Sequence, residues 1–240
     1  MRIALLCSDP NIPLGGAKGA SIHLRAVAAA LLRLGHQVSA IVGAAGPELG
    51  FMPLTERGLE VRVLRQPRTL REIDWQLSQV QPDLVLERLT LLSPEGAVAA
   101  AEAHVPHIYE VNAPLDVEAA RHRNFERIDD ARIAFARGFG ASRGAIAVSE
   151  EVAEWVRGFA PADYPVRVEP NGAGPEFLAA PDPQQILNIE QRLRLTGSEF
   201  RIGFVGSFRP WHDLDTLLHA ASELAQKVAT RLIMVGDGPQ

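Results

Sequence analysis

The chain has 240 residues, of which 47% are hydrophobic and 22% are charged, a composition that is typical of folded proteins and excludes extensive disorder. The formal net charge is −5 and basic residues alternate with acidic ones, so the sequence offers no clustered basic surface and we expect no nucleic-acid partner. The single cysteine, Cys7, excludes an internal disulfide and is predicted to be a small buried core residue.

The first apolar run, residues 3–7, is too short for the core of a secretion signal. No run of about 18 apolar residues follows it, as a membrane-spanning helix requires. We therefore expect a cytoplasmic protein that does not span a membrane. The arginine-rich segment 120–138 also contains balancing acids, so it is interpreted as a solvated helix face and peripheral membrane contact is not indicated.

Short β-forming runs alternate with longer segments of helical period along the first 170 residues. The predicted strands are 3–7, 37–42, 59–64, 84–86, 107–111, 145–148 and 166–168. The predicted helices are 24–34, 70–80, 94–103, 117–139 and 150–159. This alternation predicts an α/β domain with a doubly wound, Rossmann-like parallel sheet.

A second, shorter alternation follows a segment rich in proline and glycine. Residues 171–199 lose the sustained period and are predicted to be a linker with a connecting helix. Residues 200–240 then contain a strand, a helix and a strand, which predicts the first βαβ unit of a second Rossmann-like domain after an N-terminal domain over 1–170. The alternative is that these strands extend the first sheet.

The loop after the first predicted strand reads SDPNIPLGGAKGAS and contains Gly15, Gly16, Lys18 and Gly19. Glycines allow close backbone approach, and the N-terminus of the helix that follows presents N–H groups that suit an anion such as phosphate. The glycine spacing matches neither the dinucleotide fingerprint nor the P-loop. Two interpretations therefore remain open, a phosphate-contacting loop and a simple turn with a solvated Lys18.

Polar residues also follow later predicted strands, at the edge where open parallel sheets bind ligands. Glu110 and Asn112 end the strand 107–111 and are candidates for lining a cleft, although Asn112 also fits a turn in which Asp116 caps the next helix. The histidines lack metal-binding spacing and no metal site is predicted; His23, His36 and His219 are interpreted as helix-end or surface residues.

A further candidate group lies in the second alternation. Ser207, Arg209 and His212 share one strand-to-helix turn, where the Arg209 guanidinium offers a bidentate fork to phosphate oxygens. Asp237 follows the last predicted strand in the same way.

Taken in order, six segments resemble the retaining glycosyltransferases of family 4, which have the GT-B fold. They are SDPNIPLGGAKGAS, EVNAP, AIAVSEEV, VEPNGAGPEFL, GFVGSFRPWHDLD and RLIMVGDGP. The resemblance implies two Rossmann-like domains, a nucleotide-sugar donor held mainly by the second, and a glycan, lipid-linked or small-molecule hydroxyl acceptor held mainly by the first. It also implies transfer of a hexose without a metal or another cofactor.

The resemblance assigns roles by position. Gly15, Gly16 and Lys18 match the glycine-rich loop near the donor diphosphate or the acceptor. Asn112 stands where many members have a histidine near the transferred sugar, and it is the candidate catalytic residue. The pair Asn171 and Gly172 matches the motif that opens the interdomain hinge.

The resemblance also marks two departures. Ser207 and His212 stand where the commoner pattern has an Arg and a Lys that neutralise the diphosphate, so Arg209 and a protonated His212 are expected to replace them. The two-glutamate motif of the family lies beyond residue 240, so we expect no measurable transfer by this chain alone.

Two other function classes are weighed against the glycosyltransferase. One is a non-catalytic module that binds a nucleotide or glycoconjugate. The other is a nicotinamide-dependent oxidoreductase, which is disfavoured because the predicted strand 37–42 is followed by Gly43, Ala44 and Ala45 rather than by the acid that would hold the ribose.

Overall fold

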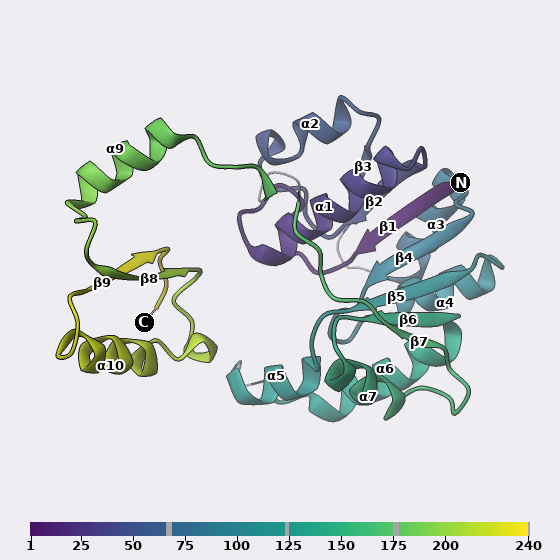
Figure 1. Ribbon diagram of the computed structural model, residues 1–240. Helices are drawn as coiled ribbons and strands as arrows, with labels where there is room; N and C mark the ends of the chain where they lie inside the picture. Colours follow the sequence, from purple (N-terminus) through teal and green to yellow (C-terminus); the bar gives the residue numbers. More distant parts are fainter. Residues whose placement is uncertain (66–68, 123–124, 175–177, 240) are drawn as a thin grey trace. The chain divides into compact units, whose positions relative to one another are not determined.

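The computed structural model describes residues 1–65, 69–122, 125–174 and 178–239. It divides into two compact units, Met1–Gly172 and Ala173–Gln240, which are considered separately below (Figure 1). Among the described residues, no helix has the length and apolar character needed to cross a membrane.

The unit Met1–Gly172 contains a seven-stranded parallel sheet within the described residues, with strand order β3-β2-β1-β4-β5-β6-β7. The predicted α/β class and doubly wound topology are confirmed. The strands read as apolar runs because both faces of a parallel sheet are buried. Their bounds are β1 (Arg2–Cys7), β2 (Gln37–Val42), β3 (Glu60–Val63), β4 (Leu84–Arg88), β5 (His107–Val111), β6 (Gly144–Ala147) and β7 (Val166–Val168).

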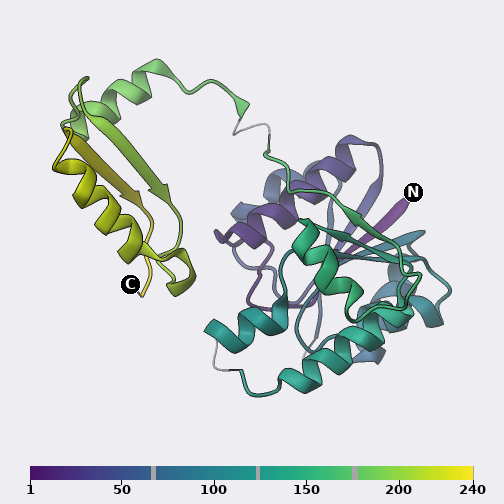
Figure 2. The same ribbon diagram turned by 60° about the horizontal axis from the view of Figure 1, so that its bottom comes forward.

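Helices cover both faces of this sheet (Figures 1 and 2). On one face, Leu24 and Ala28 of α1 pack against β1 and β2. On the other, Ile73 and Leu77 of α3 pack with α4 against β1 and β4. The helices of this unit are α1 (Gly19–Arg33), α2 (Met52–Thr55), α3 (Leu70–Val80), α4 (Glu95–Glu102), α5 (Leu115–His122), α6 (Ile128–Ala141) and α7 (Glu150–Arg157), with a short 3₁₀ helix η1 (Glu48–Gly50).

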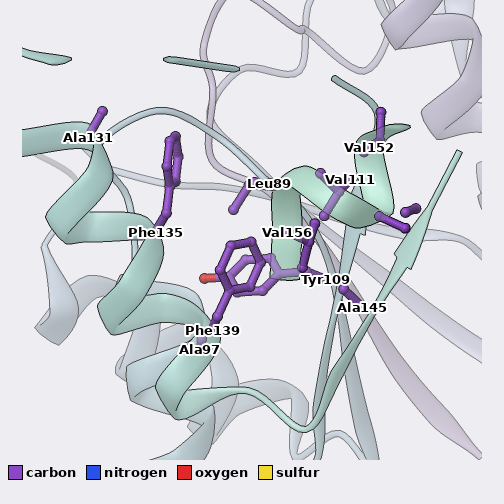
Figure 3. Close-up of a cluster of buried hydrophobic side chains, with 12 residues drawn as sticks. Leu89, Ala97, Tyr109, Val111, Ala131, Phe135, Phe139, Ala145, Val152 and Val156 are labelled. Atoms are coloured by element: carbon purple, nitrogen blue, oxygen red, sulfur yellow. The ribbon is translucent and has the colours of Figure 1, made fainter. Parts of the chain in front are cut away.

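An aromatic cluster forms the core beside β5 and β6 (Figure 3). Tyr109 of β5 packs edge-on against Phe139 of α6, with ring centroids 5.4 Å apart, and Phe135 packs edge-on against Trp155 of α7 at 5.1 Å. Such edge-to-face pairs add a modest stabilisation to the burial of the rings. The cluster fixes α6 and α7 against the half of the sheet that carries Glu110 and Asn112.

The predicted single helix over 117–139 is wrong, because the structure has two helices, α5 and α6, with non-helical residues Phe125–Arg127 before α6. Phe125 packs against the aromatic cluster. The break lets α5 bury Ala119 and α6 bury Phe135 and Phe139 on separate axes, which one straight helix cannot do. The short helices η1 and α2 were also not predicted.

The unit Ala173–Gln240 has its own two-stranded parallel sheet of β8 (Phe200–Val205) and β9 (Thr230–Val235), joined by α10 (Leu214–Ala225). Figure 2 shows α10 running alongside this pair. The alternative that these strands extend the first sheet is therefore wrong. A further helix, α9 (Pro183–Leu193), precedes β8 and is capped by the Asp182 side chain.

Apolar side chains remain exposed on the short sheet of this second unit. Val205 is 81% exposed, Phe200 57% and Val235 53%. Parallel strands are normally covered on both faces, so these side chains lack the covering that the strands of the first unit have.

Candidate functional site

The strand order of the first unit reverses at β1, which lies between β2 and β4. In open parallel sheets this switch point opens a crevice at the carboxyl ends of the strands, and ligands bind there. The segments that leave β1, β4 and β5 at this edge are the glycine-containing loop 8–18, the segment from Leu89 and the residues from Asn112.

Hydroxyl groups anchor the glycine-containing loop at its start. The Ser8 hydroxyl forms hydrogen bonds with Thr90 Oγ1 at 3.0 Å and Ser93 Oγ at 3.1 Å, and all three residues are buried. Further along the loop, the Gly15 N–H donates to the Ala45 carbonyl at 2.7 Å. The loop is thus attached both to the segment after β4 and to the segment after β2.

The two adjacent glycines have steric reasons to be glycine. A Cβ on Gly15 would run into the carbonyl of Pro47, whose carbon would lie 2.9 Å away. On Gly16 it would lie 2.8 Å from Ser21 Oγ. Contacts this short force neighbouring atoms to move, so larger residues at these positions would reshape the loop.

Arg25 of α1 holds the loop by donating to the carbonyls of Leu14 at 2.5 Å and Gly16 at 2.8 Å. The Gly16 N–H donates within the loop to Pro13, and Lys18 Nζ donates to the Asn11 carbonyl at 3.2 Å. The amides of Gly15 and Gly16 are therefore used by backbone carbonyls. The Ser21 and Ile22 N–H groups also donate, to the Lys18 carbonyl, so an anion at this end of α1 would be met by the N–H groups of Gly19 and Ala20.

Glu110 sits in a charged group at the end of β5. Arg88, at the end of β4, is its register partner across the sheet, and His23 of α1 contacts Glu110 Oε1 through Nε2. The side chains are 18% exposed for His23 and 9% for Glu110. The interpretation of His23 as a helix-end or surface residue is therefore wrong, because the helix turns it toward a carboxylate 87 positions away.

The environment of Glu110 favours its ionised form. Burial alone would raise its pKa, but the contact with His23, the Asn112 amide and the charge of Arg88 together outweigh burial, and the pKa lies below its ordinary value of 4.5. The carboxylate is thus a fixed negative charge at the sheet edge at neutral pH.

Asn112 lies directly after Glu110 and Val111, and its side chain is held by a distant residue. Its Oδ1 accepts a hydrogen bond from Asn171 Nδ2 at 3.0 Å, and its buried Nδ2 lies beside Glu110. The predicted site residues Glu110, Asn112 and Asn171 therefore form one group. Gly172 follows as the last residue of this unit.

Asp116, by contrast, is a structural residue. It is buried near the start of α5 and accepts hydrogen bonds from Trp155 Nε1 at 2.8 Å and Arg132 Nε at 2.9 Å. It ties α5 to α6 and α7 from inside α5, as the second residue of that helix, so the interpretation of Asp116 as the cap preceding the helix is wrong.

A second buried ionisable pair lies on the opposite face of β4 and β5. His107 Nε2 and Glu87 Oε2 are 2.8 Å apart, and both side chains are almost fully buried. Burial raises the pKa of Glu87, although the contact with His107 works against it. Gly96 of α4 packs directly on this carboxylate. The sequence interpretation missed this pair.

In the second unit, the loops after β8 and β9 approach each other backbone to backbone. The Gly206 N–H donates to Val235 at 3.0 Å, and the Phe208 N–H donates to Asp237 at 2.7 Å. Gly236 has a φ of 143°, and a Cβ there would strike the carbonyl of Gly206. Gly236 is therefore needed for this close approach.

The predicted residues of this turn come together. The His212 ring contacts the Ser207 carbonyl through Nδ1, and the Arg209 N–H donates to the same carbonyl at 2.9 Å. Because a carbonyl only accepts, this contact uses the His212 tautomer that carries its proton on Nδ1. Asp237 belongs to the facing loop after β9, where its carbonyl accepts from the Phe208 N–H.

The described parts of the chain contain no group of three or more His, Cys, Asp or Glu side chains placed to hold a metal ion. The sites in both units are instead built from hydroxyl, amide, guanidinium and imidazole groups around glycine-containing loops.

The reversed parallel sheet gives the first unit a Rossmann-like α/β topology, which matches the N-terminal domains of GT-B proteins. Residues 17–177 match the sequence model described as Glycosyltransferase Family 4, and the chain belongs to this family. No curated protein sequence matches the chain significantly.

Several solved structures share the fold over nearly the whole of this chain. The crystal structure of Anabaena HepE in complex with UDP-glucose is 22% identical, with a TM-score of 0.72 over 98% of this chain and 60% of that one. Sucrose-phosphate synthase from Thermosynechococcus elongatus is 15% identical, with a TM-score of 0.70 over 98% of this chain and 62% of that one.

A glycosyltransferase from Rickettsia africae is 12% identical, with a TM-score of 0.61 over 97% of this chain and 68% of that one. At these identities the likeness concerns the fold. The chain spans about 60% of the length of the HepE structure.

Proposed function

We propose that this chain supplies the acceptor-side domain and the start of the donor-binding domain of a retaining glycosyltransferase. The enzyme transfers a hexose from a nucleotide sugar to a hydroxyl acceptor without a metal or another cofactor. The observation that carries the proposal is the polar group of Glu110, Asn112 and Asn171 at the switch-point edge, in a segment of sequence that belongs to family 4.

The binding of UDP-glucose by HepE, which shares the fold, supports a nucleotide-sugar donor. In this proposal Asn112 lies near the transferred sugar and Glu110 lines its cleft. Gly15, Gly16 and Lys18 place the first turn of α1 toward a phosphate or the acceptor.

In the second unit, Ser207, Arg209 and His212 hold the donor diphosphate, with Asp237 lining the same corner. The charge of Arg209 and the second proton of His212 would offset the negative charge that develops on the leaving diphosphate. Asn171 and Gly172 form the hinge.

Donor binding tests this proposal directly. Isothermal titration of the 240-residue chain with UDP-glucose, UDP and NADH should show binding of the first two alone. Arg209→Ala should weaken UDP binding by about 10- to 100-fold, because a charge-assisted hydrogen bond contributes roughly 1.5–3 kcal/mol.

Arg231→Ala is the matched control, since Arg231 lies at the start of β9 and pairs with Glu199 at 3.2 Å. Equal losses in the two variants, or binding of NADH in preference to UDP-glucose, would count against the proposal.

A further inference from the structure

The Asn112 amide is held by a hydrogen bond at its oxygen and faces a carboxylate at its nitrogen. The oxygen accepts from the Nδ2 group of Asn171 at 3.0 Å. The nitrogen is buried near the Glu110 carboxylate and makes no hydrogen bond within the described residues. A flipped amide would place oxygen against carboxylate and NH₂ against NH₂, and both contacts would be repulsive. The side chain therefore has one favourable orientation.

Glu110 cannot easily adapt to a flipped amide. His23 holds one carboxylate oxygen from α1, and Arg88 lies beside it on β4, so the side chain is restrained from two elements. Its pKa below the ordinary value means that it stays an acceptor at neutral pH. The Glu110 side of the amide is thus set by the sheet and α1.

The position of Asn171, at the oxygen end of the amide, is determined by the segment that leaves the sheet after β7. The last ladder-type hydrogen bond before it runs from the Glu169 N–H to the Ala147 carbonyl at 2.8 Å. Beyond it the chain leaves the sheet, and unit Met1–Gly172 ends one residue after Asn171. The position of the Asn171 donor therefore depends on the direction in which residues 170–172 leave the domain.

We propose that Asn171 is a positioning residue that fixes the orientation of the Asn112 amide and ties it to the conformation of the segment leaving the first unit. The inference rests on the proposed function, in which Asn112 lies near the transferred sugar. When the segment turns so that Asn171 withdraws, the Asn112 oxygen loses its donor and becomes available to a substrate hydroxyl.

Side-chain NMR of the asparagine carboxamides tests the contact without any need for activity. In the 240-residue chain labelled with ¹⁵N-asparagine, Asn171→Ala should shift the Asn112 side-chain resonances. It should also make the Asn112 carboxamide more mobile, seen as a lower ¹⁵N order parameter, because its oxygen loses the hydrogen bond from Asn171 Nδ2. Asn171→Asp should have a larger effect, because its carboxylate favours the flipped amide while Glu110 opposes it.

The conservative rescue is the double variant Glu110→Gln with Asn171→Asp. The carboxamide introduced at position 110 can donate to the flipped Asn112 oxygen, and the carboxylate introduced at position 171 can accept from the Asn112 nitrogen. A restrained Asn112 carboxamide, with a high ¹⁵N order parameter, should therefore return in the double variant and not in either single variant. Asn188→Asp is the control, since Asn188 is exposed on α9. A purely structural role of Asn171 would not produce this rescue.

The proposal is overturned if Asn171→Ala and Asn171→Asp change the Asn112 side-chain signals no more than Asn188→Asp does, or if the double variant shows no rescue. These outcomes are independent of UDP-glucose binding. A chain that shows the shifts and the rescue without binding a nucleotide sugar would keep the positioning role and refute the proposed function. A chain that binds UDP-glucose but shows neither the shifts nor the rescue would support the proposed function and refute the positioning role of Asn171.

Discussion

Gly96 is the position where the structure predicts the clearest effect of a single methyl group. A Cβ there would lie 2.5 Å from Leu6 Cδ2 and 2.6 Å from Glu87 Cδ, and closer still to Glu87 Oε2. Glu87 and Leu6 are both fully buried in neighbouring strands, so neither can swing into solvent. Gly96→Ala must therefore displace the Glu87–His107 pair or the strand beneath it.

The expected magnitude follows from two opposing effects. Overpacking of a close-packed core costs about 1–3 kcal/mol. Replacing glycine by alanine in a helix gains at most about 1 kcal/mol, and less in the first turn where Gly96 lies. We expect a net destabilisation of about 1–2 kcal/mol, measured as a lower midpoint in urea unfolding followed by far-ultraviolet circular dichroism.

Gly140→Ala is the matched control, because Gly140 lies in α6 and a Cβ there meets nothing within 4 Å. The same chemical change should leave stability unchanged or raise it by up to about 1 kcal/mol. If the Gly96→Ala and Gly140→Ala variants have the same unfolding free energy, and that free energy falls equally steeply with urea concentration, the packing argument for the buried pair is wrong.

Three further outcomes are expected. The ionised Glu110 stabilises the folded state fully above its ordinary pKa of 4.5, and this contribution is lost as pH falls through the lowered pKa of the folded state. His23→Ala removes one cause of the lowered pKa, so acid unfolding should begin at a higher pH. An unchanged acid unfolding curve would contradict this. Burial raises the pKa of the Cys7 thiol to about 12, so a thiol reagent at about pH 8 should react only after denaturation, and labelling of the native chain would refute this. Asp116→Ala should lower the unfolding free energy by about 1–3 kcal/mol, since it leaves the part-buried Trp155 N–H without its acceptor, whereas Val117→Ala on the exposed side of α5 should have little effect.

The sheet could be predicted from the sequence because parallel strands buried on both faces appear as apolar runs that alternate with helices. The break between α5 and α6 could not. It depends on the burial of Phe125 against an aromatic cluster and on contacts from Asp116 to two other helices, and these are tertiary interactions without a local signal.

For the site, the carboxyl-edge rule was enough to select Glu110 and Asn112. It could not select His23, because nothing local reveals a partner 87 positions away. The Glu87–His107 pair left a weaker signal, namely ionisable residues inside otherwise apolar strands, which indicates that they neutralise one another in the core.

The uncovered side chains of β8 and β9 have a consequence for how the protein behaves in solution. Open apolar strands pair with strands of other molecules and promote self-association, and Phe200, Val205 and Val235 are exposed on such strands. The first unit, in contrast, buries most apolar residues of its central strands in three clusters of its own. The exposed apolar side chains of β8 and β9 therefore favour self-association of the 240-residue chain, however stable the sheet that carries Glu110 and Asn112 is.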